Sequence, residues 1–163
     1  MKVKIKKLEP NAVIPFYATE GAAGMDLTAT SVNEDSYGNL VYGTGLAFEI
    51  PKGYVGLLFP RSSNAKKDLM LTNCVGVLDS DYRGEVTFKL RPMYHNVKNG
   101  ILSRIISLFT GEKTVTYFNF EEYEIGDKIG QIVIIKHPNI DFVEVDELSK
   151  TLRGTGGYGS TGK

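Results

Sequence analysis

The sequence has little of what several common classes of protein require. Its 163 residues include one cysteine, Cys74, two histidines and no tryptophan. One cysteine cannot form an intramolecular disulfide, and with only His95 and His137 to join it, a Cys/His zinc site is not expected. Lysine plus arginine and aspartate plus glutamate balance at 19 each, so no overall positive field exists to attract nucleic acid or an anionic membrane.

Long apolar runs are missing as well. No stretch approaches the ~20 apolar residues that a transmembrane helix needs. The N-terminal sequence MKVKIKKLEP alternates charged with apolar side chains, which is unlike a secretory signal. We therefore expect one domain with one sizeable core, located in the cytoplasm (of the host cell if the gene is phage or viral), with neither nucleic acid nor membrane as a partner.

Short apolar or alternating runs separated by turn residues dominate the chain. In 46–50, apolar side chains alternate with smaller or charged ones, as in a strand with one buried face. The other runs of this kind are 54–59, 86–90, 115–118 and 132–135. Many short strands at close spacing predict a sandwich, a jelly roll or a small barrel. Two segments fit a helix better: 64–69, which follows a candidate cap at Ser63 or Asn64, and 101–109.

Glycine is the residue in excess, with 18 in the chain. The segment 153–162, RGTGGYGSTG, combines five of them with an arginine, a tyrosine and hydroxyl groups. Backbone N–H groups without a neighbouring Cβ can converge on an anion, Arg153 can bind phosphate oxygens through two nitrogens, and Tyr158 can stack on a base. A disordered tail is the alternative interpretation of this segment.

Two further segments carry polar groups where strands end. FPRSS, at 59–63, places an arginine and two hydroxyls before the helix-like segment, which suits a phosphate site and also an ordinary capped helix. In NCVGVLDSDYRG, at 73–84, an apolar run leads into Asp79. We expect a partly buried carboxylate there, able to orient or deprotonate a water molecule. Asp81 is more typical of a residue that caps the turn.

The remaining segments are less informative by themselves. AGMDL, at 23–27, sets Asp26 inside an apolar turn, where the carboxylate can serve a divalent ion directly or through water. GDKIGQ, at 126–131, predicts only a turn that opens a strand.

Taken in order, five segments resemble the five motifs of the trimeric deoxyuridine triphosphatase (dUTPase) family. They are AGMDL at 23–27, PRSS at 60–63, GVLDSDYRGE at 76–85, GDKIGQ at 126–131 and RGTGGYGSTG at 153–162. Each motif alone is weak, but five in this order along almost the whole chain are specific. The resemblance implies an all-β, jelly-roll-like fold with one or two short helices. It also implies a homotrimer with shared active sites that hydrolyses dUTP to dUMP and pyrophosphate by water attack on the α-phosphate, limiting uracil in DNA and supplying dUMP.

The same resemblance implies the roles of individual residues. Asp79 is the implied catalytic residue, which holds and activates the water. Tyr82 packs on the deoxyribose and leaves no space for a 2′-hydroxyl. Mg²⁺ sits on the triphosphate oxygens and on waters, with Asp26 reaching it through water. The other implied substrate-binding residues are Arg61, Ser62, Ser63, Asn73, Val77, Leu78, Gln131, Arg153, Tyr158, Gly159, Ser160 and Thr161.

The domain organisation follows from the same comparison. We expect a β-rich core over 1–152, with an insertion at about 95–120, and a flexible glycine-rich lid over 153–163 that closes on the nucleotide. The family gives no guidance on the insertion. Its helix-like segment 101–109 is expected to pack on a subunit of the trimer, or else to offer a surface to a protein partner.

The chain departs from the family pattern at three motif positions. Lys128 stands where the family usually has arginine, Gly130 where it has alanine, and Tyr158 where it has phenylalanine. Lysine keeps the positive charge but lacks the fork of donors that arginine offers.

Two other functions remain compatible with the sequence. A dCTP deaminase shares the fold and the RSS-type motif, although the DSDYRGE hairpin and the aromatic tail follow the dUTPase pattern. A binding or regulatory protein on the same scaffold is the third alternative, although the acidic residues of all the motifs are present.

Overall fold

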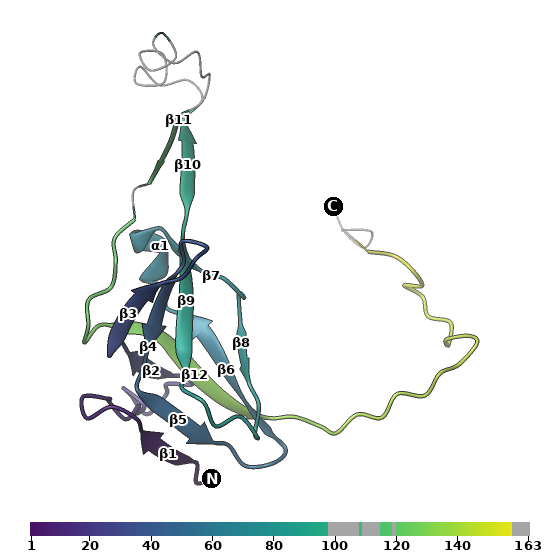
Figure 1. Cartoon of the computed structure of the whole chain (residues 1–163). Coiled ribbons are helices and arrows are strands. Elements are labelled where there is room, and N and C mark those ends of the chain that lie inside the picture. Colours follow the sequence, from purple (N-terminus) through teal and green to yellow (C-terminus); the bar gives the residue numbers. More distant parts are fainter. Residues whose placement is uncertain (98–107, 109–114, 119, 158–163) are drawn as a thin grey trace.

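Antiparallel strands make up almost all the regular structure in the computed structural model, which describes residues 1–97, 108, 115–118 and 120–157 (Figure 1). The elements are β1 (Lys4–Lys7), β2 (Met25–Thr28), β3 (Ser31–Glu34), β4 (Leu40–Gly43), β5 (Leu46–Glu49), β6 (Tyr54–Pro60), α1 (Asn64–Lys67), β7 (Leu69–Leu71), β8 (Gly76–Leu78), β9 (Thr87–Pro92), β10 (Tyr94–Val97), β11 (Val115–Phe118) and β12 (Lys128–Lys136). The all-β prediction is confirmed. No helix in the described ranges is long and apolar enough to cross a membrane.

Two four-stranded sheets share one hydrophobic core. Their strand orders are β2-β12-β6-β8 and β3-β4-β9-β7, and two strand pairs, β1-β5 and β10-β11, complete the topology. The alternation in β9 buries Phe88 and Leu90 while their neighbours face solvent. These side chains join Tyr42 of β4 and Leu27 and Ile132 of the other sheet in one buried cluster. The period-two pattern of the sequence therefore produces the core.

Gly130 lies in β12, the central strand that pairs with both β2 and β6. A Cβ at this position would overlap the aromatic ring of Phe88 from the facing sheet. The space that a methyl group would need is therefore taken by a phenylalanine ring. This close approach explains why the chain has glycine where the family usually has alanine.

The helix predicted over 64–69 is shorter in the structure. It covers Asn64–Lys67, and Leu69 already begins β7. Ser63 stands at the N-cap, but its backbone is helical and its side chain makes no capping hydrogen bond. The capping interpretation was therefore wrong, because the Ser63 hydroxyl binds another side chain instead.

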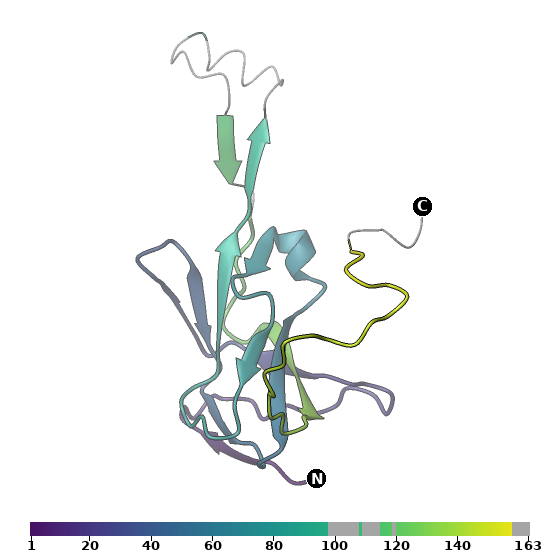
Figure 2. The same cartoon turned by 90° about the vertical axis from the view of Figure 1, so that its right-hand side faces the viewer.

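Two segments of the chain leave the body of the molecule (Figure 1). The predicted insertion contains the β10-β11 hairpin, which extends beyond β9 in both views (Figures 1 and 2). The predicted helix 101–109 lies outside the described residues except for position 108.

After β12, the chain runs from 137 to 157 as an arm without helix or strand (Figure 1). Many of the large apolar side chains of this arm are exposed, and Phe142 is 94% exposed. The exposed apolar residues of the arm are Ile140, Phe142, Val143, Val145, Leu148 and Leu152. A stretch of this composition is typical of a segment that packs on another chain.

Candidate active site

Three of the predicted motifs meet at one end of the β2-β12-β6-β8 sheet. Asp26 is in β2, Arg61 follows β6, and Lys128 begins β12. Arg61 Nε lies 3.1 Å from Oδ1 of Asp26, and Lys128 Nζ lies 3.0 Å from Oδ2. Arg61 also donates a hydrogen bond from Nη1 to the backbone oxygen of Lys128, at 3.0 Å. Because β12 pairs with both other strands, it brings together residues that are far apart in the sequence.

This Asp26 cluster, defined as Asp26, Arg61 and Lys128, carries one negative and two positive charges. Its side chains remain between a quarter and a half exposed. A half-open group with excess positive charge suits an anionic ligand. Lys128 therefore still binds the carboxylate from the position where the family usually has arginine.

Gln131 extends the same face of the sheet. It is directly opposite Asp26 on β2 and Phe59 on β6, so its side chain lies on their side of the sheet. Its Nε2 donates to the backbone oxygen of Pro60 at 3.4 Å. The structure thus brings Asp26, Arg61 and Gln131 together in one chain.

The loop between β6 and α1 presents polar groups next to this cluster. Ser62 is exposed, whereas Ser63 is half-buried and its Oγ lies 2.8 Å from the Oη of Tyr123. In the described part of the chain, the backbone N–H groups of Ser62 and Ser63 donate no hydrogen bond. The role of Tyr123 could not be predicted from the sequence. This tyrosine lies between glutamates in EEYE, and such a polar stretch does not indicate a buried side chain.

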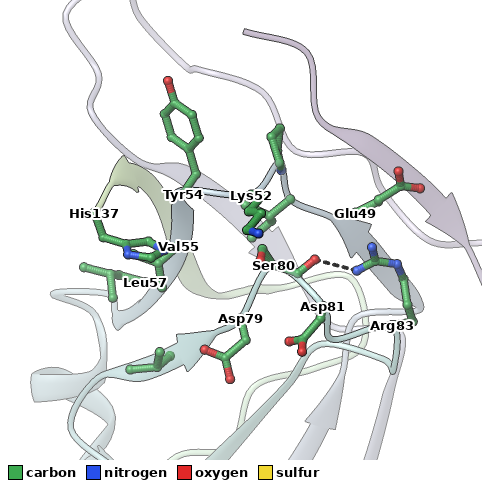
Figure 3. A pocket seen from close by; sticks show the side chains of 13 residues that line it. Glu49, Lys52, Tyr54, Val55, Leu57, Asp79, Ser80, Asp81, Arg83 and His137 are labelled. Carbon is green, nitrogen blue, oxygen red and sulfur yellow. Dashed lines mark hydrogen bonds between the residues drawn. The ribbon is translucent and has the colours of Figure 1, made fainter. Parts of the chain in front are cut away.

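Asp79 lies in a second region, at the end of β8. This strand is at the edge of the sheet, and the chain turns directly after Leu78. The Tyr82 N–H donates to the Asp79 backbone oxygen at 3.2 Å, and Arg83 Nη1 donates to the Ser80 oxygen at 2.8 Å (Figure 3). The Asp79 carboxylate is exposed, not partly buried as expected, because Asp79 lies in the turn just beyond Leu78, the last buried residue of this edge strand. Among the described residues, neither Asp79 nor Asp81 has a side-chain hydrogen bond or ion pair, so the capping role expected for Asp81 is not observed.

Two hollows border Asp79. The smaller one, of about 210 Å³, is lined by Asn73, the β8 residues and Tyr82. The larger is an open cleft of about 1000 Å³, where Tyr54, Leu57 and His137 face Arg83 across the hairpin (Figure 3). The structure therefore brings together the predicted base- and sugar-binding residues Asn73, Val77, Leu78 and Tyr82 around the carboxylate.

Tyr82 is 47% exposed and donates from Oη to the Glu85 backbone oxygen at 3.1 Å. A Cβ at position 84 would overlap its hydroxyl and ring. Gly84 thus allows the ring to lie against the hairpin backbone, with its other face open to a ligand.

The two regions are well separated within one chain. Leu78 pairs with Gly56 near the start of β6, whereas Arg61 follows Pro60 at its end. Arg61 is five positions after Gly56 along the chain. At ~3.3 Å per residue, five positions of extended chain correspond to about 17 Å. Asp79 therefore lies at the opposite end of β6 from the Asp26 cluster.

The last predicted motif is only partly described. Arg153 donates from Nε to the Gly156 backbone oxygen at 2.9 Å, within the exposed arm. Tyr158, Gly159, Ser160 and Thr161 lie outside the described residues. Within the described ranges, no three His, Cys, Asp or Glu side chains are grouped closely enough to hold a metal ion. A divalent ion would therefore depend on ligands from the substrate and from water.

Comparison with known proteins gives a consistent result. The sequence model of the dUTPase family matches residues 10–93. The deoxyuridine 5′-triphosphate nucleotidohydrolase of Hydrogenobaculum sp. is 36% identical, over 99% of both chains. A Staphylococcus bacteriophage 80alpha dUTPase, solved with dUPNHPP, superposes with a TM-score of 0.73 at 26% identity over 99% of both chains. A dUTPase from phage phi11 of S. aureus, described as coordinating a structural Mg(II) ion, has a TM-score of 0.63 at 26% identity and covers 90% of this chain and 98% of its own.

Proposed function

This chain belongs to the dUTPase family and is a dUTP diphosphatase, and we propose that its active sites are assembled from three copies of the chain. The reaction converts dUTP and water to dUMP and pyrophosphate. It limits the incorporation of uracil into DNA and supplies dUMP.

The Asp26 cluster and its neighbours bind the triphosphate in this proposal. Arg61 and Gln131 address the phosphate chain from the sheet, and Ser62 and Ser63 address it from the loop beside α1. The support is the convergence of these motifs around a carboxylate bound by two cations. The phosphate oxygens of an incoming triphosphate can compete with Asp26 for the Arg61 guanidinium. The planar guanidinium can donate two parallel hydrogen bonds to phosphate oxygens.

Asp79 activates the attacking water. Its carboxylate is exposed and has no side-chain partner among the described residues, so its oxygens can accept a proton from water. The water oxygen forms the new bond to the α-phosphorus, and the bond from that phosphorus to the bridging oxygen breaks. The bonding electrons leave with pyrophosphate, and the water proton passes to Asp79. Such a reaction needs positioning and charge neutralisation more than a covalent intermediate.

The base and sugar occupy the smaller hollow beside Asp79. Backbone groups around Val77 and Leu78, with Asn73, bind the uracil, and Tyr82 packs on the deoxyribose. The support is that these residues line one hollow of about 210 Å³ next to the carboxylate. The Tyr82 ring would then exclude a 2′-hydroxyl by contact.

Mg²⁺ is the metal that the family implies, and the residues present fit it in an indirect role. Both oxygens of Asp26 already bind cationic side chains, and a set of several acidic ligands is missing from the described ranges. We propose that Asp26 holds the ion through water, while the triphosphate oxygens bind it directly. The bound ion would supply neutralisation of charge on the phosphates.

The homotrimer rests on one observation above all. Asp79 lies one residue beyond the Leu78–Gly56 pair, so in one chain it is about 20 Å from Arg61 along β6 at ~3.3 Å per residue. That separation is too large for both residues to act on one triphosphate. A site that contains both therefore needs Asp79 from one copy and Arg61 from another. The arm with its exposed apolar side chains supports the same conclusion, because it can carry Arg153 and the tail to a further copy.

Mixed assemblies test this proposal. Asp79→Asn and Arg61→Ala should each remove most dUTP turnover when expressed alone. Co-expressed in equal amounts, they should recover activity, because random mixing in a cyclic trimer gives about a quarter of the sites an unaltered residue at both positions. Pyrophosphate release from dUTP by the purified mixed trimers is the measurement.

A matched pair provides the control. Asp79→Asn and Tyr82→Ala alter the same hairpin, so every mixed site carries one of the two defects and activity should not return. Recovery in this control, or none with the first pair, would contradict sites shared between chains. Parallel assays with dCTP and with UTP distinguish the deaminase and an unselective hydrolase from the dUTP diphosphatase.

The prediction that 95–120 packs on a subunit of the trimer, or else offers a surface to a protein partner, remains a prediction. Its support is that the β10-β11 hairpin extends away from the body (Figure 2).

A further inference from the structure

A buried tyrosine lies directly behind the loop that carries Ser62 and Ser63. Tyr123 is 3% exposed, and its Oη donates to Oδ1 of Asn64 at 2.6 Å while lying 2.8 Å from Oγ of Ser63. It thus contacts two consecutive residues at the start of α1. Nothing in the proposed reaction yet uses this hydroxyl.

Counting hydrogens fixes the direction of these two bonds. A tyrosine hydroxyl has one hydrogen, and Oδ1 of Asn64 can only accept. Because that hydrogen goes to Asn64, Ser63 must donate its own hydroxyl hydrogen to Tyr123. The Ser63 side chain therefore has no hydrogen left for a phosphate oxygen, whereas its backbone N–H and the exposed Ser62 still do.

We infer that Tyr123 is a positioning residue for the phosphate loop, with Ser63 as the anchor through which it acts. This inference rests on the proposed function of that loop. Ser63 is held by its side chain, and it binds the phosphate chain through its backbone N–H. Ser62 supplies the hydroxyl of the pair. The two serines of the PRSS motif thus have different tasks.

Tyr123 is itself firmly held. Its N–H donates to the Oη of the fully buried Tyr42 at 3.0 Å, and the two rings pack edge to face with centroids 6.0 Å apart. Lys67, at the end of α1, places its Nζ 4.8 Å from the centre of the Tyr123 ring. Three residues further on, the chain turns at Gly126 into β12, which carries Lys128 and Gln131. Tyr123 therefore connects the loop to the strand that completes the phosphate site.

Kinetics of single and double variants test the inference. Tyr123→Phe removes only the hydroxyl, and Ser63→Ala removes its partner. Each should lower kcat/KM for dUTP about tenfold, the order of one net hydrogen bond. The double variant should lose no more than Tyr123→Phe alone, because that variant has already lost the bond that Ser63→Ala removes. Ser63→Thr, which keeps a hydroxyl, should restore most of the activity.

Tyr42→Phe is the matched control. It removes the hydroxyl that accepts the Tyr123 N–H but leaves the Ser63–Tyr123 bond in place, so it should lower the melting temperature and reduce kcat/KM less than Tyr123→Phe does. Binding of deoxyuridine, which has no phosphate, should be unchanged in Tyr123→Phe. Binding of dUpNHpp, the dUTP analogue present in the bacteriophage 80alpha structure, should weaken.

The outcomes of these experiments distinguish the inference from its alternatives. Wild-type kinetics in Tyr123→Phe, or losses that multiply in the double variant, would overturn the inference while leaving dUTP hydrolysis intact. A loss in Ser63→Ala far greater than in Tyr123→Phe would show that the Ser63 hydroxyl binds phosphate itself. If Tyr123→Phe does not fold, Ser63→Ala is the variant that tests the inference. It should fold, because Ser63 is only half-buried. Absence of pyrophosphate release by the wild type would contradict the proposed function instead.

Discussion

The two ends of β6 differ in how their charged side chains are held. At the Arg61 end, Asp26 is bound by two cations and the loop beside α1 is anchored to a buried tyrosine. At the Gly56 end, Asp79 is exposed and has no side-chain partner among the described residues. One end is organised in advance to bind a charged group. The other leaves a carboxylate free, as a group that must accept a proton requires.

A third aspartate shows what a structural carboxylate looks like in the same molecule. Asp35 accepts hydrogen bonds from the side chain and the backbone of Asn39 and from the Tyr37 N–H, and it pairs with Lys89 at 2.9 Å. The side-chain donors of Asn39, followed by the Lys89 ammonium, hold the pKa of Asp35 well below its usual range. Asp35 is saturated by donors from its own sheet, whereas Asp79 has no side-chain donor in the part of the chain that the structure describes. The number of partners therefore distinguishes this structural acid from the acid that we propose as the proton acceptor.

The largest effect on activity is expected from a change of the free carboxylate of Asp79, at the Gly56 end of β6. Asp79→Asn keeps the shape of the side chain but removes the proton acceptor. We expect dUTP turnover to fall at least ~100-fold, since a general base contributes ~10²–10⁴-fold. Binding of dUpNHpp and the melting temperature should change little, because within the described ranges the carboxylate has no hydrogen bond or ion pair that holds the fold. Near-normal turnover would contradict the role of Asp79.

Removal of the tail should have the next largest effect. A chain that ends at Leu152 loses Arg153, Tyr158 and the hydroxyls that the lid is expected to place on the nucleotide. We expect more than ~10-fold lower kcat/KM, the order of several lost hydrogen bonds. The melting temperature and the oligomeric mass measured by light scattering should remain, because the core residues all precede the arm. Full turnover in the truncated chain would show that the glycine-rich segment is only a tail.

Much of this arrangement could be predicted from the sequence, for reasons that the structure makes clear. The alternation of apolar and polar residues along a strand is a local pattern. The all-β fold and the buried residues of β9 could therefore be predicted from it. The grouping of Asp26, Arg61 and Gln131 came from the family resemblance, because strand pairing across 100 residues leaves no local trace.

Other features depended on the tertiary neighbours of a residue. Asp79 is exposed because β8 is an edge strand, which composition does not reveal. Tyr123 is buried although it lies in an acidic run, because it packs on Tyr42 and Lys67. The helix at 64 stops early because Asp68 adopts a left-handed conformation, with φ of 51°, that a local pattern did not signal.

Charge at the Arg61 end provides the third test. Lys128→Ala removes one of the two cations that bind Asp26, so the cluster becomes neutral. We expect KM for dUTP to rise about fivefold, because the lost charge is partly exposed and screened by solvent. Lys128→Arg keeps the charge and should behave like the wild type. An equal loss in both variants would mean that the length of the lysine matters more than its charge.

The fourth prediction concerns sugar selection at the Asp79 end. Gly84→Ala places a methyl group where the Tyr82 hydroxyl and ring lie, so the exposed ring must shift. The preference for dUTP over UTP should then decrease several-fold, about the value of one contact. Stability should stay within about 0.5 kcal/mol, since the ring moves at the surface. Unchanged selectivity would indicate that the Tyr82 ring does not contact the sugar.

The smallest expected effect on catalysis comes from Gly130, which pairs with Pro60 at the Arg61 end of β6. Gly130→Ala restores the usual residue of the family, but its methyl group would overlap the Phe88 ring in the core. Overpacking of this kind costs about 1–3 kcal/mol of unfolding free energy. We therefore expect a lower melting temperature, with kcat for dUTP within about twofold, because the proposed proton acceptor, Asp79, lies at the other end of the strand. Adding Phe88→Leu should recover part of the stability, whereas Phe88→Leu alone should destabilise the protein by leaving a cavity. If Gly130→Ala is as stable as the wild type, Phe88 can move aside and the glycine is not required by packing. If it instead abolishes turnover in a fully folded trimer, the two ends of β6 are coupled more tightly than their separation suggests.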